Sequence, residues 1–328
     1  MSNIIVNIKN SKVLSNRQYS AKAEYCPDTI TTVGDSIIQH GKFNDRIYLM
    51  KLSRQDFPDI IEELDRIALR EGYSKIFAKV PSFAKDKFVN NDYIIEARIP
   101  KFYNGRENVY FMGKYFVESR MFDSRTEDIN EVLDVAMSYE NDKKNDKKNY
   151  KKNENICENI CKNIKFDLPY GFDYRICDKS HIYEIANVYK KVFNTYPFPI
   201  YDPEYIAKTM DENFIYFSIQ KNGEIVALSS SEMDIDSENV EMTDFATLPE
   251  YQGKEFAIYL LHKMEDEMIK RNIKVAYTIS RALSHGANII FAKMGYKYCG
   301  TLYNNTNISI DKTTSRNFES MNVWYRHL

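Results

Sequence analysis

The segment from Val240 to Arg271 constrains the fold of this chain most, because it reads as a strand, a loop and a helix in direct succession. Val240–Thr247 has strand-type residues, and Pro249 prevents the strand from continuing. Glu255–Arg271 has helical spacing, with an apolar stripe formed by Phe256, Tyr259, Leu260, Met264 and Met268. The first N–H groups of such a helix lack partners within it. The junction therefore predicts either an anion-binding loop or a plain strand-to-helix turn.

The segments around this unit continue the alternation of helices and strands. Periodicity and turn residues predict a mixed α/β fold, with Asn222-Gly223 as a hairpin turn between two strands. The expected helices are His181–Phe193, Pro203–Asp211 and His285–Lys293. The other expected strands are Asn213–Gln220, Glu224–Met233, Lys274–Ile279, Tyr296–Thr301 and Phe318–Tyr325.

The N-terminal half contains a fainter copy of the order helix, strand, helix, strand, strand. Ser53 to Asp56 has the pattern of a capping box at the start of the first helix. The order recurs about 200 residues later with little sequence preserved. Either a degenerate duplication or a coincidence of two α/β units explains it. The expected elements are Asp56–Glu71, Lys75–Val80, Phe83–Val89, Tyr93–Arg98 and Asn108–Lys114.

Length and one charged segment predict how the chain is divided. A chain of 328 residues favours two domains. Residues 142–165 hold eight lysines and four acids, so they carry +4, and the rest of a chain with total charge −2 carries −6. Lysines that alternate with acids and asparagines are typical of a solvated linker or an exposed helix face. We expect an N-terminal domain over 1–140, a linker over 141–168 and a C-terminal domain over 169–328.

Composition argues against several other classes of protein. A net charge of −2 gives no general attraction to nucleic acid or to an anionic membrane. No apolar run reaches the roughly 18–20 residues that span a bilayer, and the first residues lack the pattern of a signal peptide. Five scattered cysteines form neither a disulfide framework nor a zinc-binding set. We expect a cytoplasmic protein without a metal, with neither nucleic acid nor membrane as a partner.

Parts of the C-terminal half resemble a known family. Pro249–Ala257 reads PEYQGKEFA and is similar to the acetyl-CoA signature Gln/Arg-x-x-Gly-x-Gly/Ala of the GNAT family of N-acetyltransferases, with Gln252 and Ala257 at its ends. Ser284–Tyr296 resembles the second motif of that family. The stretches EMTDFATLPEYQGK, YTISRALSHGANIIFAKMGY and GTLYNNTNI look most like the β-lysine N-acetyltransferases. The resemblance implies a GNAT fold with a mixed sheet over Phe172–Leu328 and a degenerate GNAT-like N-terminal half.

The resemblance also implies acetyl-CoA as co-substrate. The end of the strand would pair with the pantetheine arm, and the loop and helix start would bind the pyrophosphate. One position departs from the signature: Glu255 replaces its central glycine and puts a carboxylate beside the pyrophosphate, a charge that Lys254 partly offsets. The implied acetyl-CoA-binding residues are Phe245, Ala246, Thr247, Gln252, Gly253, Lys254, Glu255, Phe256, Ala257, Ile258 and Ser284.

The implied chemistry needs a base, because an amine must lose its proton before it attacks a thioester. Glu241 occupies the position of a glutamate base found in some family members, although an exposed strand residue or an ammonium-binding group would look the same. Asp244 is the next candidate, but strict alternation places it on the opposite face unless the strand bulges. The tyrosine that often protonates the leaving thiolate falls at Phe291, and the possible substitutes are Tyr296, Tyr298 and His285.

Two segments are expected to recognise the acceptor. In this fold the region between the first two helices and the region between the last two strands form opposite walls of the acceptor pocket. The candidate residues there are Tyr196, Phe198, Asn304 and Asn305; the alternative is that the aromatic residues belong to the core and the asparagines to turns.

We therefore expect an acetyl-CoA-dependent N-acetyltransferase for a small amine, with the ε-amine of β-lysine as the acceptor that the resemblance favours and an acetylated compatible solute as product. The alternatives are a GNAT enzyme for another amine and a non-catalytic protein that binds acyl-CoA or an amino acid. The oligomeric state stays open, with a homodimer as one option.

Overall fold

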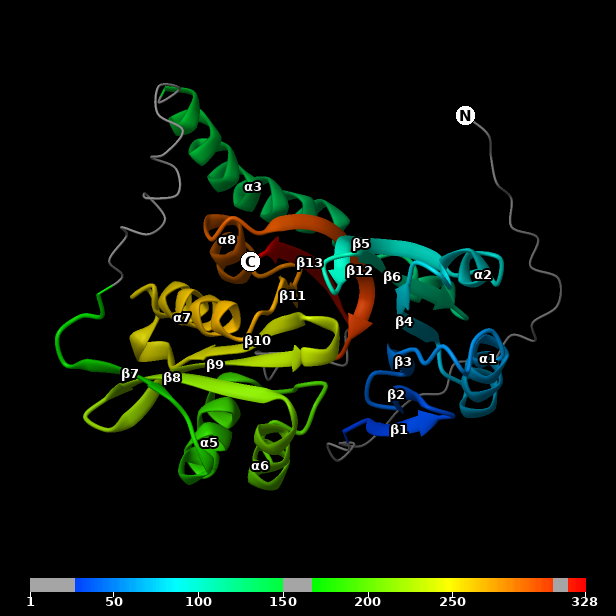
Figure 1. Cartoon of the computed structure of the whole chain (residues 1–328), viewed down its shortest axis with the longest axis horizontal. Coiled ribbons are helices and arrows are strands. Elements are labelled where there is room, and N and C mark those ends of the chain that lie inside the picture. The colour runs from blue at the N-terminus through cyan, green and yellow to red at the C-terminus, as the bar shows by residue number, and fades with distance from the viewer. Residues whose placement is uncertain (1–26, 150–166, 309–317) are drawn as a thin grey trace.

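The computed structural model describes residues 27–149, 167–308 and 318–328. Within these residues the strands form one sheet of 13, in the order β1-β2-β3-β4-β6-β5-β12-β13-β11-β10-β9-β8-β7 (Figure 1). The N-terminal strands are β1 (Thr29–Val33), β2 (Ser36–Gly41), β3 (Arg46–Lys51), β4 (Lys75–Pro81), β5 (Ile94–Tyr103) and β6 (Glu107–Tyr115). The C-terminal strands are β7 (Phe172–Ile176), β8 (Phe214–Lys221), β9 (Glu224–Asp234), β10 (Asn239–Thr247), β11 (Val275–Arg281), β12 (Lys297–Thr306) and β13 (Glu319–His327).

The helices of the described residues connect these strands. In the N-terminal half they are α1 (Ile60–Glu71) and α2 (Lys85–Val89), and α3 (Thr126–Asn149) follows β6. In the C-terminal half they are α5 (Ile182–Val192), α6 (Pro203–Glu212), α7 (Phe256–Lys270) and α8 (His285–Lys293). None of the helices in the described ranges is both long and apolar enough to cross a bilayer.

The C-terminal half has the order of elements expected from the sequence. Asn222 and Gly223, with φ of 52° and 86°, form the turn between β8 and β9. β10 is antiparallel to β9 and parallel to β11, because α7 carries the chain across one face of the sheet between β10 and β11. The strand–loop–helix junction therefore lies in the middle of the C-terminal part of the sheet.

The N-terminal half has the same strand topology. The order β2-β3-β4-β6-β5 in one half corresponds to β9-β10-β11-β13-β12 in the other. In both series the second and third strands are parallel and the other neighbours are antiparallel. In chain order, α1 follows β3 and α2 follows β4, the second and third strands of their series. In the same way, α7 follows β10 and α8 follows β11.

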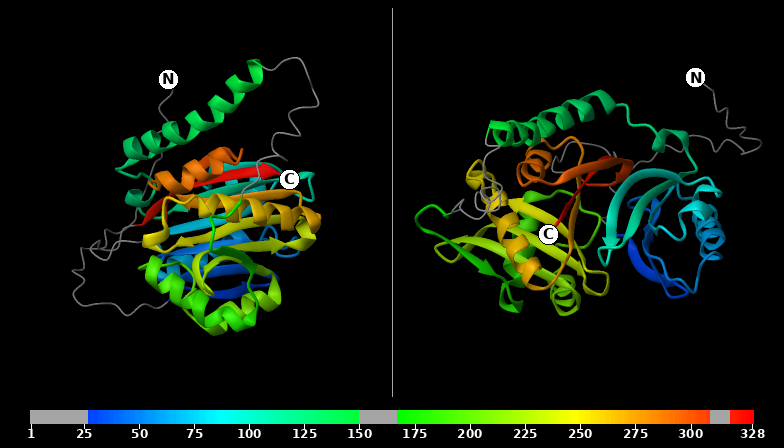
Figure 2. Two further views of the ribbon diagram at one scale, coloured as in Figure 1. Left: turned by 90° about the vertical axis from the view of Figure 1, so that its left-hand side faces the viewer. Right: turned by 45° about the horizontal axis from the view of Figure 1, so that its top comes forward.

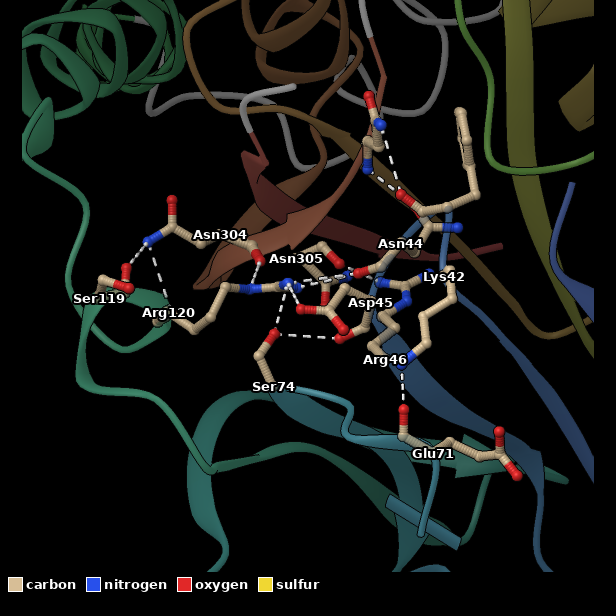
Figure 3. Close-up of polar contacts among 12 residues, drawn as sticks. Lys42, Asn44, Asp45, Arg46, Glu71, Ser74, Ser119, Arg120, Asn304 and Asn305 are labelled. Atoms are coloured by element: carbon tan, nitrogen blue, oxygen red, sulfur yellow. Dashed lines mark hydrogen bonds and ion pairs between the residues drawn. The ribbon is translucent and has the colours of Figure 1, made fainter. Parts of the chain in front are cut away.

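The two halves join through β5 and β12, the last strand of each series. Ala97 of β5 lies opposite Gly300 of β12. A Cβ added to Gly300 would lie 2.1 Å from the carbonyl oxygen of Glu96, so a glycine is needed for this close approach. Nearby, the Asn304 side chain donates a hydrogen bond of 3.2 Å to the carbonyl oxygen of Ser119 (Figure 3). The sheet is thus continuous across the boundary between the halves.

Three apolar clusters hold the layers together. One packs α1 and α2 on the N-terminal part of the sheet, and a second packs α3, α7 and α8 on the C-terminal part. The third contains buried side chains from both halves together with those of α5 and α6. Figures 1 and 2 show α5 and α6 on one side of the sheet and α7 and α8 on the other, with α3 running across α8. The face covered by α5 and α6 is therefore the one that both halves share.

Three boundaries expected from the sequence are wrong by four or five residues, and one of them is the end of β5, which extends to Tyr103 instead of Arg98. The capping box does not form: α1 begins at Ile60, because the Asp56 carboxylate instead accepts hydrogen bonds from the Ser36 hydroxyl at 2.6 Å and the Asp35 N–H at 3.0 Å. β12 continues to Thr306 instead of ending at residue 301, so the asparagines expected in a loop lie in the last part of this strand.

Some strands and one helix of the fold were not predicted from the sequence. The first three strands, over residues 29–51, and the early turns of α3 were not expected. α3 also extends to Asn149, into the segment expected to be a linker. Residues 150–166 of that segment lie outside the described residues.

Candidate functional site

A cavity of about 1050 Å³ lies between the two halves. The C-terminal half contributes β10, β11, the loop before α7 and the first turns of α7 and α8. The N-terminal half contributes side chains from alternate positions of β3 and β4, which therefore point to one face of the sheet. These are Arg46, Tyr48, Met50, Phe77 and Lys79. The site is thus composite, with walls from both halves of the chain.

One end of the cavity runs between β10 and β11. These parallel strands pair only as far as Glu241 and Tyr277. Beyond that pair the cavity continues between them, and its lining includes Phe245, Thr247, Ile279 and Arg281. A strand edge that faces a cavity offers N–H and C=O groups to an extended ligand. This end can therefore hold a long, narrow molecule along β10.

The same end has the features of an anion-binding site. α7 begins at Phe256, and the Tyr259 N–H donates to the Glu255 carbonyl oxygen at 3.1 Å. The N–H groups at the start of a helix have no partner within it, so those of the first turn of α7 are available at its cavity end. A Cβ on Gly253 would meet no heavy atom within 4 Å, which leaves open space over the loop. The cationic side chains that line this part of the cavity are Lys254, Arg281 and Lys293.

Four carboxyl groups line the cavity elsewhere: Glu212, Glu232, Glu241 and Asp244. Glu232 and Glu241 lie directly opposite each other on β9 and β10. Burial, and next the charge of Glu232, raise the pKa of Glu241 to about 8, while Lys79 and a hydrogen bond with Tyr277 act against the increase. Burial also raises the pKa of Glu232 to about 7, again against the effect of Lys79. Carboxyl groups with such pKa values can exchange protons near neutral pH.

Asp244 reaches the cavity because β10 bulges. The register with β9 shifts between Thr243 and Ala246, and Asp244 has a φ of 56°. The hydroxyl groups of Tyr196 and Ser230 donate hydrogen bonds to the two oxygens of its carboxylate. Burial raises the pKa of Asp244, and these hydrogen bonds act in the opposite direction. The bulge that the sequence left as a condition is present, but both Asp244 oxygens already have partners.

Comparison with known proteins identifies the family. Residues 180–296 match the acetyltransferase (GNAT) family. The chain is 42% identical over 299 residues to the β-lysine N(6)-acetyltransferase of Methanococcus maripaludis, an alignment that covers 91% of this chain and 98% of that protein. The chain belongs to the GNAT family. It is also 31% identical over 272 residues to the β-lysine N(6)-acetyltransferase of Methanosarcina mazei, with 83% of this chain and 98% of that protein covered.

Solved structures of GNAT enzymes also match. One is the ribosomal-protein-S18-alanine N-acetyltransferase from Escherichia coli, with a TM-score of 0.40 and 15% identity. The match covers 48% of this chain and 93% of that one.

GNAT acetyltransferases use acetyl-CoA as co-substrate, and the end of the cavity between β10 and β11 fits this molecule. The edge of β10 suits the amide groups of a pantetheine arm. The first turn of α7 and the open loop at Gly253 suit a pyrophosphate, which carries the negative charge that a helix N-terminus stabilises. These features lie in the same cavity as the carboxyl groups of β9 and β10.

Glu255, the departure from the GNAT signature, keeps the backbone conformation that a glycine adopts easily. Its φ is 58°, in the left-handed region, where a residue with a side chain costs about 1–2 kcal/mol. The side chain is 67% exposed, and its carboxylate lies 3.7 Å from the Lys293 ammonium group. The glutamate is therefore accommodated by strain and by a partly exposed ion pair with α8.

Most of the residues predicted from the sequence come together in this cavity. Ser284 is the N-cap of α8 and accepts a hydrogen bond from the Ala287 N–H. Ala246 is buried in the apolar cluster that both halves share, so only its backbone is relevant to the cavity. The predicted residues that line the cavity are Tyr196, Phe198, Glu241, Asp244, Phe245, Thr247, Gln252, Gly253, Lys254, Glu255, Phe256, Ala257, Ile258, Ser284 and Asn305.

Two predicted site residues lie elsewhere. Tyr296 is fully buried in the cluster of α7 and α8, on the other face of the sheet, with its ring 5.1 Å from that of Phe291. It follows the end of α8, and its side chain packs beneath the helix instead of reaching the cavity. Asn304 is 9% exposed, and its amide donates to carbonyl oxygens of the segment before α3, so it holds the two halves together. Neither side chain belongs to the cavity lining.

The structure adds site residues that sequence reasoning missed. Glu232 was hidden because its proximity to Glu241 depends on the register between β9 and β10. Arg46 and Lys79 lie next to apolar residues in strands of the N-terminal half that otherwise carry one lysine each, and Tyr48 lies between apolar neighbours. Charged residues in such strands were the available signal, because charges are seldom buried without a partner or a function.

Proposed function

We propose that this acetyltransferase acetylates the N6 amine of β-lysine. The observation that carries the proposal is the cluster of Glu232, Glu241 and Asp244 beside the acyl-donor end of a composite cavity. β-Lysine carries two amines, which are ammonium groups at neutral pH and need carboxylate or other oxygen acceptors. The names of the two relatives from Methanococcus maripaludis and Methanosarcina mazei support the same substrate.

We assign the role of base to Glu241. Acetyl-CoA, when bound, supplies a thioester that a neutral amine can attack. Glu241 accepts the proton of the ammonium group, and its pKa of about 8 makes it a stronger base than an ordinary glutamate. Glu232 maintains this basicity through its charge, while Asp244, held by Tyr196 and Ser230, helps to position the ammonium group. Tyr277 contacts Glu241 and orients its carboxylate.

We assign acetyl-CoA binding to the loop and first turn of α7. The N–H groups from Gly253 to Ile258 would hold the pyrophosphate, and the edge of β10 from Phe245 to Thr247 would pair with the pantetheine arm. Lys254 and Lys293 add positive charge where the phosphates would lie.

A panel of amines tests the substrate assignment. Purified protein is incubated with acetyl-CoA and β-lysine, α-lysine, ornithine or a linear diamine, and thiol release is followed. The proposal predicts that β-lysine gives the highest kcat/KM. It is wrong if β-lysine releases no more thiol than a blank reaction while another amine of the panel is acetylated.

We further propose that the N-terminal half is a degenerate copy of the GNAT fold that lost its own catalytic machinery. The shared strand order and directions of the two halves support this. The third residue pair between the two parallel strands involves Glu241 of β10 in the C-terminal half and Tyr48 of β3 in the N-terminal half. The N-terminal copy therefore has no carboxylate base at the position of Glu241. The cytoplasm remains the proposed location, in keeping with the unpaired thiols of Cys177 and Cys299.

A further inference from the structure

Arg46 of β3 is a buried cation whose hydrogen-bonding capacity is largely unused. Its side chain lines the cavity, yet the residue is only 3% exposed. The guanidinium donates through Nη1 to the backbone oxygen of Asn305 at 2.6 Å (Figure 3). Its Nε is buried and has no hydrogen-bond partner within the described part of the chain. Burial lowers the pKa of Arg46 to about 10, so it remains charged at neutral pH.

The neighbouring Arg120 shows what a purely structural arginine does at this boundary. It is equally buried, with 3% of its surface exposed, and does not belong to the cavity lining. It donates to the Ser74 hydroxyl at 2.8 Å and to the Asn304 backbone oxygen at 3.1 Å, and Asp45 lies 3.8 Å away (Figure 3). Among the described residues no carboxylate forms an ion pair with Arg46, although the charges of Asp28 and Glu96 act on it; the Tyr48 ring centroid lies 5.4 Å from its guanidinium carbon. A buried arginine that faces a cavity in this way is suited to an anionic ligand.

Asn305 provides an unused acceptor from the other half. It is 2% exposed, lines the same cavity and carries an Oδ1 that is buried without a hydrogen-bond partner among the described residues. Its backbone oxygen is the partner of the Arg46 guanidinium, so the two residues meet at one place in the wall. A positively charged donor from β3 and a residue with an unpaired oxygen acceptor from β12 therefore line the same part of the cavity.

Tyr48 lies beside Arg46 and lines the same cavity as the carboxyl groups. Burial raises the pKa of Tyr48, the charges of Glu241 and Glu232 raise it further, and Arg46 acts in the opposite direction. The tyrosine is thus close enough to both the cation and the acids to respond to each. The cavity lining consequently includes the carboxyl groups of Glu232 and Glu241 and the cation of Arg46, whose guanidinium carbon lies 5.4 Å from the Tyr48 ring centroid.

We propose that Arg46 and Asn305 form the subsite for the head of the amino-acid substrate, with Arg46 binding its carboxylate and Asn305 accepting from the ammonium group two carbons away. This rests on the proposed function, because it takes the distal amine to be the one that reacts at Glu241. A β-amino acid presents a carboxylate and an ammonium group close together, which matches the donor and acceptor of this wall. The N-terminal half then selects amino acids over simple diamines, and the C-terminal half performs the acetyl transfer.

The test compares β-lysine with β-lysinamide, in which an uncharged amide replaces the carboxylate. For the wild type we expect a KM about 10- to 100-fold lower for β-lysine than for the amide, as for a buried charge-assisted hydrogen bond. Arg46→Gln should raise the KM for β-lysine by that factor, leave the KM for the amide almost unchanged and change kcat less than threefold. Arg120→Gln, a matched loss of a buried arginine, should lower thermal stability and keep the preference for the acid.

A second variant covers the case in which Arg46→Gln does not fold. Asn305→Asp has nearly the same size, and its carboxylate would pair with Arg46 and repel that of the substrate. It should abolish the preference for β-lysine over the amide while the protein keeps its circular dichroism spectrum. Lys79→Met tests the other cation from the N-terminal half in the cavity and should leave the preference in place.

Two results would overturn the subsite. One is an unchanged preference in Arg46→Gln or Asn305→Asp; the other is a preference that disappears in Lys79→Met instead. Failure of the proposed function looks different, because the wild type would then not acetylate β-lysine at all. In that event the same comparison, made with the amino acid that is acetylated and its amide, still decides the role of Arg46.

Discussion

Glu232→Gln should shift the pH dependence of acetylation to lower pH. In the free enzyme the base must be ionised, so kcat/KM should rise with pH through the pKa of Glu241, which is about 8. Glu232 lies opposite Glu241 on the neighbouring strand, and its negative charge is the second cause, after burial, of that raised pKa. Replacing it with a neutral side chain of the same size removes the repulsion and makes Glu241 easier to ionise.

The size of the effect follows from Coulomb's law. Opposite residues on antiparallel strands have their Cβ atoms about 5 Å apart. Two full charges about 6 Å apart interact by roughly 3 kcal/mol at an effective dielectric constant of 20, equivalent to about two pH units. Lys79 offsets part of this repulsion, and Glu232, with its own pKa near 7, is only partly ionised over much of the range. We therefore expect the acidic limb to move down by about one pH unit, roughly 1.4 kcal/mol.

The assay is the pH profile of kcat/KM for β-lysine, measured by thiol release between pH 6 and 10 at saturating acetyl-CoA. Glu265→Gln is the matched control: burial raises the pKa of Glu265 to about 7 as well, but Glu265 lies on the other face with Arg326 at 3.1 Å. That variant should keep the wild-type profile. Glu241→Gln should lower kcat at least 100-fold at pH 8, as loss of a general base does, and replace the limb near pH 8 with a rise that follows ionisation of the substrate amine at about pH 10. A limb that keeps its midpoint near pH 8 in Glu241→Gln, or one that does not move in Glu232→Gln, would refute the assignment of Glu241.

Three further predictions concern residues outside the acid cluster. Glu255→Gly should lower the KM for acetyl-CoA. It should leave the free energy of unfolding within about 1 kcal/mol of wild type, because relief of the left-handed φ of 58° is offset by loss of the pair with Lys293. Glu255→Gln removes the charge but keeps the side chain, and a higher KM for acetyl-CoA in both variants would contradict the prediction. Tyr296→Phe should retain kcat within twofold, since its ring lies on the face away from the cavity, whereas a tenfold loss would restore its catalytic role. Gly300→Ala should lower the free energy of unfolding by about 1–3 kcal/mol, because the new Cβ would meet the Glu96 carbonyl oxygen. Denaturant unfolding measures this change. A variant as stable as the wild type would show that β5 and β12 approach each other less closely.

The sequence predicted the part of the site that local patterns encode. The junction after β10 has a strand, a proline, a glycine loop and an amphipathic helix in succession, so its position could be read directly and an anion site proposed there. Glu241 could be placed on the strand before it. The bulge that turns Asp244 into the cavity could be stated only as a condition, because a bulge depends on register with the neighbouring strand.

The composite nature of the site could not be read from the sequence. Glu232 and Glu241 are brought together by pairing between strands, and Arg46 and Asn305, which are 259 positions apart in the chain, by the contact of β5 with β12. Such contacts are set by tertiary packing, which local periodicity does not specify. The misplacement of Tyr296 has the same origin, because its position after a helix does not reveal on which face of the sheet the side chain lies.

Identification of the product by NMR and mass spectrometry tests the central claim most directly. β-Lysine, acetyl-CoA and the purified protein are incubated, and the position of the acetyl group on the product is determined together with the amount of thiol released. We predict one acetyl group per thiol, attached to N6, with the amine on carbon 3 left free. Acetylation at carbon 3, or turnover with other amines but none with β-lysine, would contradict the proposed function.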